Sequence, residues 1–218
     1  HLVTIHNFAQ PIVVELTFTD VYVGLEGEMG QFEINNAPKG LKNAILDDFN
    51  NSYPSLKGQV TADQLCSLEN VLGIDIGEGT TDYTVITNGH ANPVASVSMS
   101  TGYGNVLESA VGILQNESMN IPDRNALRHF LSEPAVMPTK RARQKHAQET
   151  VNDQLTHFND DIIEKTSQVM RQAGTDLEAA FVFGGGSVPL LKETDLRPRL
   201  VNKLKGFAGG YDIPVIWI

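Results

Sequence analysis

The residues with the clearest chemical potential form one short segment, residues 75–82, with the sequence DIGEGTTD. Apolar runs flank it on both sides, so we expect a tight β-hairpin turn. Glycine has no Cβ and permits positive φ, so the backbone N–H groups of Gly77, Gly79 and Thr80 can converge on one anion. The Thr80 and Thr81 hydroxyls add donors. The segment predicts a phosphate-binding hairpin; the alternative is a glycine-rich turn with a purely structural role.

Acidic residues stand at both ends of this hairpin. Asp75 ends a buried apolar run, where a single carboxylate suits a Mg²⁺ ion held through its waters. Asp82 begins the returning strand, where a carboxylate can orient a water molecule. Glu78 lies at the turn itself, and we expect it to take part in ligand binding together with its glycine and threonine neighbours. The flanking acids favour the phosphate-binding interpretation over the structural one.

A second glycine-rich segment, residues 183–187 with the sequence FGGGS, follows the apolar run 179–183. Gly184, Gly185 and Gly186 allow a flat ring to lie against bare backbone, and a helix that starts next would attract phosphate at its N-terminus. Ser187 is the expected N-cap of that helix. Strand–glycine–helix connections also occur for packing reasons alone. The two glycine motifs together indicate a ligand site more strongly than either one alone.

The segments that must position these motifs alternate between strands and helices. Strands are predicted at residues 2–5, 12–19, 21–25, 71–74, 83–87, 93–99, 179–183 and 213–218, and Asn88-Gly89 predicts a two-residue hairpin turn within a three-stranded meander. Helices are predicted at residues 40–53, 106–114 and 123–131, the last with Pro122 in its first turn. A further helix of about thirty residues should end at Gly174. Residues 55–69 are expected to be loop. This order predicts an α/β structure with a mixed sheet.

The two motifs resemble those of the actin-like ATPases, the superfamily of actin, Hsp70 and the sugar kinases. Residues 75–82 are similar to its second phosphate motif, D-x-G-x-G-T-T-D, and residues 182–187 to its adenosine motif. The resemblance implies an actin-like (ribonuclease H-like) ATPase lobe: a mixed five-stranded sheet flanked by helices, with a helical outer subdomain. It also implies ATP and Mg²⁺ in a cleft between two lobes, and hydrolysis by water without a covalent intermediate.

Within the superfamily, residues 23–33 loosely resemble a segment of the bacterial plasmid-segregation actins of the ParM type. In those proteins a glutamate follows a valine by three residues, on a strand ahead of an amphipathic helix. The resemblance implies that Glu26 orients or activates the attacking water. Glu28 is the competing candidate, and a surface glutamate without a catalytic role is the alternative for either.

The resemblance covers about the second half of such a protein. It implies that residues 1–27 are the last strands of the first lobe and residues 28–218 the second lobe, with the outer helical subdomain at about 105–172. The chain begins with His1 rather than methionine, so we expect a processed chain or a piece of a longer one, with the first phosphate motif upstream. The 218 residues alone are expected to hydrolyse ATP poorly or not at all.

Charge and composition limit the classes of partner that this chain can bind. The chain has 16 Lys+Arg against 26 Asp+Glu, a net charge of −10, which argues against direct nucleic-acid binding. No signal peptide or membrane span is apparent, so a cytoplasmic protein is expected. The single cysteine, Cys66, should be a buried apolar residue. The six histidines are scattered singly and predict no metal site.

One basic cluster, with Lys140, Arg141, Arg143 and Lys145, lies at the start of the long helix. This cluster could contact nucleotide, a neighbouring subunit or DNA. The favoured interpretation is that it is simply the solvent-exposed start of a helix.

Three functions are consistent with the sequence. The first is an ATPase that self-associates into filaments and moves DNA or other cargo through a DNA-bound adaptor protein. The second is a non-polymerising member of the same superfamily, chaperone-like or sugar-kinase-like. The third is a nucleotide-binding module without turnover.

Overall fold

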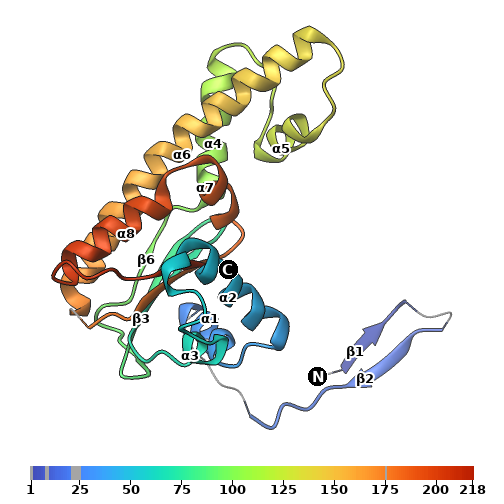
Figure 1. Cartoon of the computed structure of the whole chain (residues 1–218). Helices are drawn as coiled ribbons and strands as arrows, with labels where there is room; N and C mark the ends of the chain where they lie inside the picture. Colours follow the sequence, from blue (N-terminus) through green and yellow to red (C-terminus); the bar gives the residue numbers. More distant parts are fainter. Residues whose placement is uncertain (1, 8–9, 21–25, 175) are drawn as a thin grey trace.

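The computed structural model describes residues 2–7, 10–20, 26–174 and 176–218, and the side chains of residues 26–28 lie outside that description. Its elements form a small two-stranded sheet and a large mixed sheet with helices on both faces (Figure 1). In chain order the elements are β1 (Leu2–Ile5), β2 (Ile12–Glu15), α1 (Glu26–Asn35), α2 (Lys39–Ser52), the 3₁₀ helix η1 (Pro54–Leu56), α3 (Ala62–Cys66), β3 (Val71–Ile76), β4 (Thr81–Thr87), β5 (His90–Ala91), β6 (Val97–Met99), α4 (Tyr103–Asn116), α5 (Arg124–Ser132), α6 (Pro138–Ala173), β7 (Ala179–Phe183), α7 (Ser187–Glu193), α8 (Leu196–Phe207) and β8 (Val215–Trp217).

The large sheet has the strand order β5-β4-β3-β7-β8, and β6 also pairs with β4. Strand β4 is antiparallel to β3, whereas β7 is parallel to both β3 and β8. This confirms the predicted mixed sheet. The chain reverses at β4 through Asn88 and Gly89, whose φ values of 52° and 75° match the predicted two-residue hairpin turn.

The predicted number of five strands is wrong, because six strands form the large sheet in the described part of the chain. The segment expected to be one strand, residues 93–99, contributes only β6. Between β5 and β6 the Asn92 side-chain oxygen accepts hydrogen bonds from the N–H groups of Val94 and Ala95, both at 3.2 Å. Ser96 Oγ then accepts the Val85 N–H at 3.0 Å. This turn divides the third strand of the meander into two short pieces.

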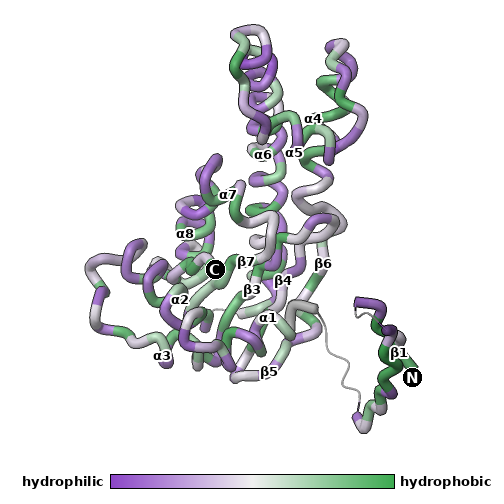
Figure 2. Tube along the Cα trace, turned by 90° about the vertical axis from the view of Figure 1, so that its right-hand side faces the viewer, coloured by the Kyte–Doolittle hydropathy of each residue, from purple (hydrophilic) through white to green (hydrophobic). Residues whose placement is uncertain are grey.

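Two apolar clusters bury the faces of the sheet. Alternate residues of β3, such as Leu72, Ile74 and Ile76, pack against α4, α6 and α8, whereas Val71 packs against α1, α2 and α3. Figure 2 shows this pattern as apolar residues along β3 and β7 and polar residues along much of the outer helices. A strand buried on both faces has a continuous apolar sequence, and the run at 71–74 therefore predicts β3.

The long helix α6 has 36 residues, and Gly174 follows it at a φ of 91°. The predicted apolar stripe is buried, including Val151, Leu155 and Ile162. One half of α6 lies along the sheet and α8. The other half projects beyond the sheet together with α4 and α5 (Figure 1). No helix in the described part of the chain is long and apolar enough to cross a membrane.

Strands β1 and β2 form an antiparallel hairpin that lies apart from the large sheet (Figure 1). Its second strand ends at Glu15, short of the predicted 12–19, and the strand predicted at 21–25 lies outside the described residues. The proposed lobe boundary at residue 27 therefore stays a prediction.

Two local predictions are wrong. Residues 55–69, expected to be loop, include the helix α3. Thr61 is its N-cap, and Thr61 and Gln64 form a reciprocal capping box at its start. Pro122 lies outside α5 rather than in its first turn. The N-cap is Asp123, whose carboxylate accepts the Ala126 N–H at 2.8 Å, because a side-chain acceptor satisfies a free N–H group that proline cannot.

Candidate functional site

The first glycine motif is the β3–β4 hairpin, as predicted. The register places Asp75 opposite Asp82 and Ile76 opposite Thr81. The Gly77 N–H donates to the Thr80 carbonyl at 2.9 Å and closes the turn, so in this structure it is not available to a ligand. The N–H groups of Gly79 and Thr80 donate to no acceptor among the residues that the structure describes, and both residues are exposed. The hairpin thus presents two of the three expected backbone donors.

The two threonine hydroxyls serve the protein itself. Thr80 Oγ1 donates to Asp82 Oδ2 at 2.9 Å. Thr81 is fully buried, and its Oγ1 donates to the Thr101 carbonyl at 2.8 Å, which ties the hairpin to the loop before α4. Thr81 therefore positions the hairpin in this structure, whereas the sequence predicted a ligand donor.

Helix α4 starts directly against the hairpin. The N–H groups of Tyr103 and Gly104 donate to the carbonyls of Gly77 and Glu78 at 3.0 and 2.7 Å. A Cβ atom at Gly104 would lie 2.7 Å from the Glu78 carbonyl oxygen, so only glycine permits this approach. Two of the free N–H groups at the α4 N-terminus are thereby used to hold the hairpin.

The second glycine motif meets the first at the same end of the sheet. Because β7 runs parallel to β3, Phe183 lies opposite Asp75, and the following loop reaches the hairpin. The Gly186 N–H donates to the Ile76 carbonyl at 2.8 Å. Gly184 has a φ of 90°, and a Cβ there would lie 2.3 Å from Asp75 Oδ1. Gly185 is exposed, with open space around the position of a Cβ. Two motifs that lie far apart in sequence therefore form one surface.

Ser187 is not the N-cap of the following helix. Gly186 occupies the N-cap position, and Ser187 is the first residue of α7. Its side chain is buried, and its Oγ donates to the Gly184 carbonyl at 2.8 Å. The reason is the turn itself, which also directs the Ser187 N–H to the Gly184 carbonyl at 3.1 Å. The hydroxyl therefore stabilises the glycine loop from within. Helix α7 has only seven residues.

The two aspartates are neighbours across the β3–β4 ladder. Directly opposite residues of an antiparallel pair project from the same face, so Asp75 and Asp82 bring two carboxylates together. Two carboxylates placed in this way can share one bound cation. The described residues hold no group of three or more His, Cys, Asp or Glu side chains placed for a metal. Two carboxylates without a protein cage suit Mg²⁺, which keeps its waters and shares phosphate oxygens.

Helix α1 packs on β3 and on the Phe183 ring at the end of β7. It begins at Glu26, and Glu28 is in its first turn, but the side chains of both glutamates lie outside the described residues. The helix rests on the Phe183 ring: a Cβ at Gly30 would lie 2.7 Å from it, and one at Gly73, on β3, 3.5 Å from it. The ring of Phe183, the first residue of the second glycine motif, therefore sets how closely α1 approaches the sheet.

Sequence reasoning missed the residues that surround Glu78. Arg128 Nη2 lies 2.6 and 2.8 Å from the two Glu78 carboxylate oxygens, and Arg124 Nε lies 3.3 Å from Oε1. The Arg128 guanidinium also lies over the Tyr103 ring, 5.7 Å from its centroid. A glutamate at a hairpin tip suggests that a cationic partner lies nearby. The sequence does not identify that partner, because Arg128 is 50 residues from Glu78 and no local pattern links the two.

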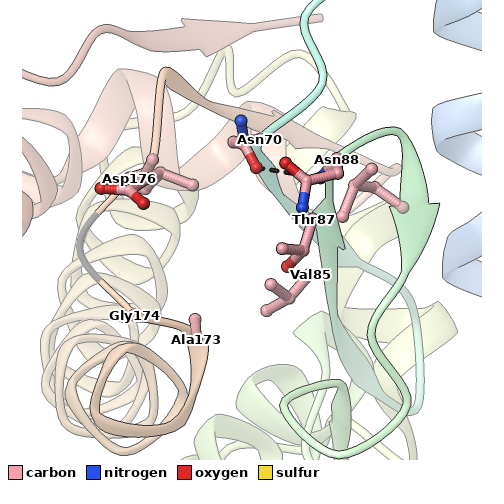
Figure 3. Close-up of a pocket in the computed structure, with 9 residues that line it drawn as sticks. Asn70, Val85, Thr87, Asn88, Ala173, Gly174 and Asp176 are labelled. Carbon is pink, nitrogen blue, oxygen red and sulfur yellow. Dashed lines mark hydrogen bonds between the residues drawn. The ribbon is translucent and has the colours of Figure 1, made fainter.

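A separate cavity lies at the opposite end of the sheet. It has a volume of about 110 Å³ and is bordered by the end of α6, the start of β3 and the end of β4 (Figure 3). Asn70 Oδ1 accepts the Asn88 N–H at 3.0 Å beside it. None of the predicted site residues lines this cavity.

An α/β lobe that joins an aspartate-glycine hairpin to a glycine loop at one end of a mixed sheet defines the actin-like class. The sequence profile described as "Archaeal actin homologue MreB-like, C-terminal" matches residues 73–195, which is more than half of the chain and includes both motifs. The chain belongs to this family. The resemblance to actin-like proteins is thereby confirmed, whereas a particular closeness to the ParM type remains a proposal.

Solved structures with similar folds include Ta0583, an archaeal actin homologue, at 20% sequence identity and a TM-score of 0.48. The match covers 83% of this chain and 49% of that one. The ethanolamine utilization protein EutJ from Carboxydothermus hydrogenoformans matches at 17% identity and a TM-score of 0.39, over 68% of this chain and 44% of that one. The chain thus spans about half the length of these structures. A search of curated proteins finds no match in sequence.

Proposed function

We propose that this chain is the part of an actin-like ATPase that binds the phosphates and adenosine of ATP with Mg²⁺. One observation carries the proposal: the Gly186 N–H donates to the Ile76 carbonyl, and Gly184 packs on the Asp75 carboxylate, so both glycine motifs share one surface. A phosphate site and an adenosine site must adjoin if they are to hold one nucleotide.

The residues present fit that ligand. The exposed N–H groups of Gly79 and Thr80 can donate to phosphate oxygens, and the open face of Gly185 leaves room for a flat ring. Asp75 would hold Mg²⁺ through its waters, and that ion would supply charge neutralisation for the phosphates. Phosphoryl transfer mainly requires that the protein position the reacting groups and stabilise the charge of the transition state. These residues would provide both.

The water-orienting role is assigned to Glu26, with Glu28 as the competing candidate, and Asp82 can assist it from the hairpin. Helix α1 begins with Glu26, and its Gly30 lies against the ring of Phe183, the first residue of the second glycine motif; this supports the proposal. Replacing Glu26 by Ala should slow phosphate release by the full-length protein and leave nucleotide binding nearly unchanged. Unchanged hydrolysis would transfer the role to Glu28.

The test of nucleotide binding is a titration of the chain with ATP and Mg²⁺, followed by amide resonances. Resonances of both 77–81 and 184–187 should shift together and saturate at the same concentration. Shifts at neither motif would contradict ATP binding. Shifts at the hairpin alone would indicate an anion site without an adenosine site.

We also propose that the full-length protein assembles into filaments in the cytoplasm and segregates plasmid or other DNA in the manner of ParM-type actins. Membership of a family of actin homologues supports assembly. The net charge of −10 favours attachment to DNA through an adaptor protein over direct binding.

Light scattering and pelleting of the full-length protein with ATP, ADP and no nucleotide would test assembly. Polymer that depends on ATP and Mg²⁺ is expected. Its absence in every nucleotide state would exclude the filament and favour a non-polymerising member of the superfamily.

A further inference from the structure

The glutamate at the tip of the phosphate hairpin pairs with two arginines of helix α5. Arg128 and Arg124 lie one turn apart on α5, and both contact the Glu78 carboxylate. Arg124 Nη1 also lies 2.8 Å from Glu108 Oε1 on α4. The Glu78 side chain is 47% exposed and that of Arg128 38%, so the pair lies at the surface of the site rather than in the core.

An exposed ion pair of this kind contributes little to folding. Its position is more informative. Glu78 immediately precedes Gly79, so its charge lies beside the backbone donors that would bind phosphate. A carboxylate there repels a polyphosphate, and each added unit of ligand charge increases the repulsion. The two arginines offset that charge.

Tyr103 connects this ion pair to the second glycine motif. Its ring lies under the Arg128 guanidinium, and its N–H donates to the Gly77 carbonyl. A Cβ at Gly186 would lie 2.8 Å from Tyr103 Cβ. The guanidinium is therefore held against two elements of the site, the hairpin and the start of α4, and is not free to leave Glu78 without cost.

We propose that Arg128 is a positioning residue that acts through Glu78 and sets the preference of this site for nucleotides with more phosphates. Arg124 assists it. The proposal rests on the proposed function, because it assumes that the ligand phosphates lie at the hairpin. It assigns α5, which belongs to the predicted outer subdomain, a direct part in nucleotide selection.

The experiment measures the affinities of the chain for ATP, ADP and adenosine, each with Mg²⁺, by titration of the amide resonances. Arg128→Gln should lower the ratio of ATP to ADP affinity about fourfold, the effect of one uncompensated charge at about 5 Å in water. Adenosine binding should not change. Glu78→Gln should raise the same ratio. The double variant Glu78→Gln/Arg128→Gln should return close to the parent, and Arg128→Lys should keep most of the parent ratio.

Arg171→Gln is the matched control, since it removes an exposed arginine in the last turn of α6 and should leave the ratio unchanged. An unchanged ratio in both Arg128→Gln and Glu78→Gln would overturn the proposal. So would an equal loss for ATP, ADP and adenosine, which would indicate a general disturbance of the site. If the parent chain binds no nucleotide, the proposed function fails and this proposal fails with it.

Discussion

The two glycine-rich connections of this protein have similar compositions but differ in how closely Gly79, in the first, and Gly184 and Gly186, in the second, are packed. In the β3–β4 hairpin, a Cβ at Gly79 would meet nothing within 4 Å, and the tip is exposed. In the β7–α7 loop, a Cβ at Gly184 would lie 2.3 Å from the Asp75 carboxylate, and one at Gly186 would lie 2.8 Å from Ile76 and Tyr103. One glycine leaves space open, whereas the others allow the chain to close on its neighbours.

The difference separates two reasons for glycine at a binding site. Gly184 and Gly186 let the second motif approach the first, so they are needed before any ligand arrives. Gly79 has no such packing role. Because it lacks a side chain, a ligand can approach its backbone from the solvent. Substitutions can therefore test which glycine belongs to the fold and which to the ligand.

The largest effect is expected for Gly184→Ala. A φ of 90° is unfavourable for alanine, and the new Cβ would collide with Asp75, so the free energy of unfolding should fall by about 3 kcal/mol or more. Chemical denaturation measures this change. Gly185→Ala is the control, because open space surrounds it, and should change the value by no more than about 0.5 kcal/mol. Equal effects at both positions would refute the distinction between packed and open glycines.

Gly30→Ala tests whether packing around the second motif extends to α1. The added methyl group would meet the Phe183 ring at 2.7 Å, so we expect a loss of about 1–3 kcal/mol in unfolding free energy. Gly40→Ala, in helix α2, has open space and should be neutral or stabilising by up to about 1 kcal/mol. A neutral Gly30→Ala would mean that α1 moves freely over Phe183. Slower phosphate release by the full-length Gly30→Ala protein would connect this contact to the proposed role of Glu26.

Asp75→Asn tests the aspartate pair that lies between the two motifs. Loss of one of two opposed carboxylates should reduce the Mg²⁺-dependent gain in ATP affinity about tenfold. Titration of ATP with and without Mg²⁺ separates this gain from metal-independent binding. Asp153→Asn, an exposed aspartate on α6, makes the same chemical change away from the site. The same Mg²⁺ dependence in Asp75→Asn as in the parent would exclude Asp75 as the metal residue.

The smallest effect on stability is expected for Gly79→Ala. Its methyl group would enter open space, so the free energy of unfolding should change by no more than about 0.5 kcal/mol. ATP affinity should nevertheless fall, because the methyl group would lie where phosphate approaches the backbone. Thermal denaturation and ATP titration of the same sample compare the two effects. Unchanged ATP affinity would place the phosphates elsewhere.

Much of the fold could be predicted because its signals are local. The apolar run that became β3, the turn at Asn88 and Gly89, and the end of α6 at Gly174 each depend on a few neighbouring residues. The capping box that begins at Thr61 is an equally local signal, and it marks the start of α3 within the segment expected to be loop. The division of the third meander strand was harder to predict, since it depends on Ser96 bonding to Val85 on another strand.

The sequence by itself determined the two glycine motifs, the acids that flank the first, and the mixed α/β order that brings such motifs to one end of a sheet. Only the tertiary structure decided how the side chains are used. It assigned the Thr81 hydroxyl to Thr101, buried Ser187 within its own turn and placed Arg128 on Glu78. The physical reason is that hydrogen bonds and ion pairs act over a few ångströms. Which distant partner comes within that distance depends on strand register and helix packing, and no local pattern records it.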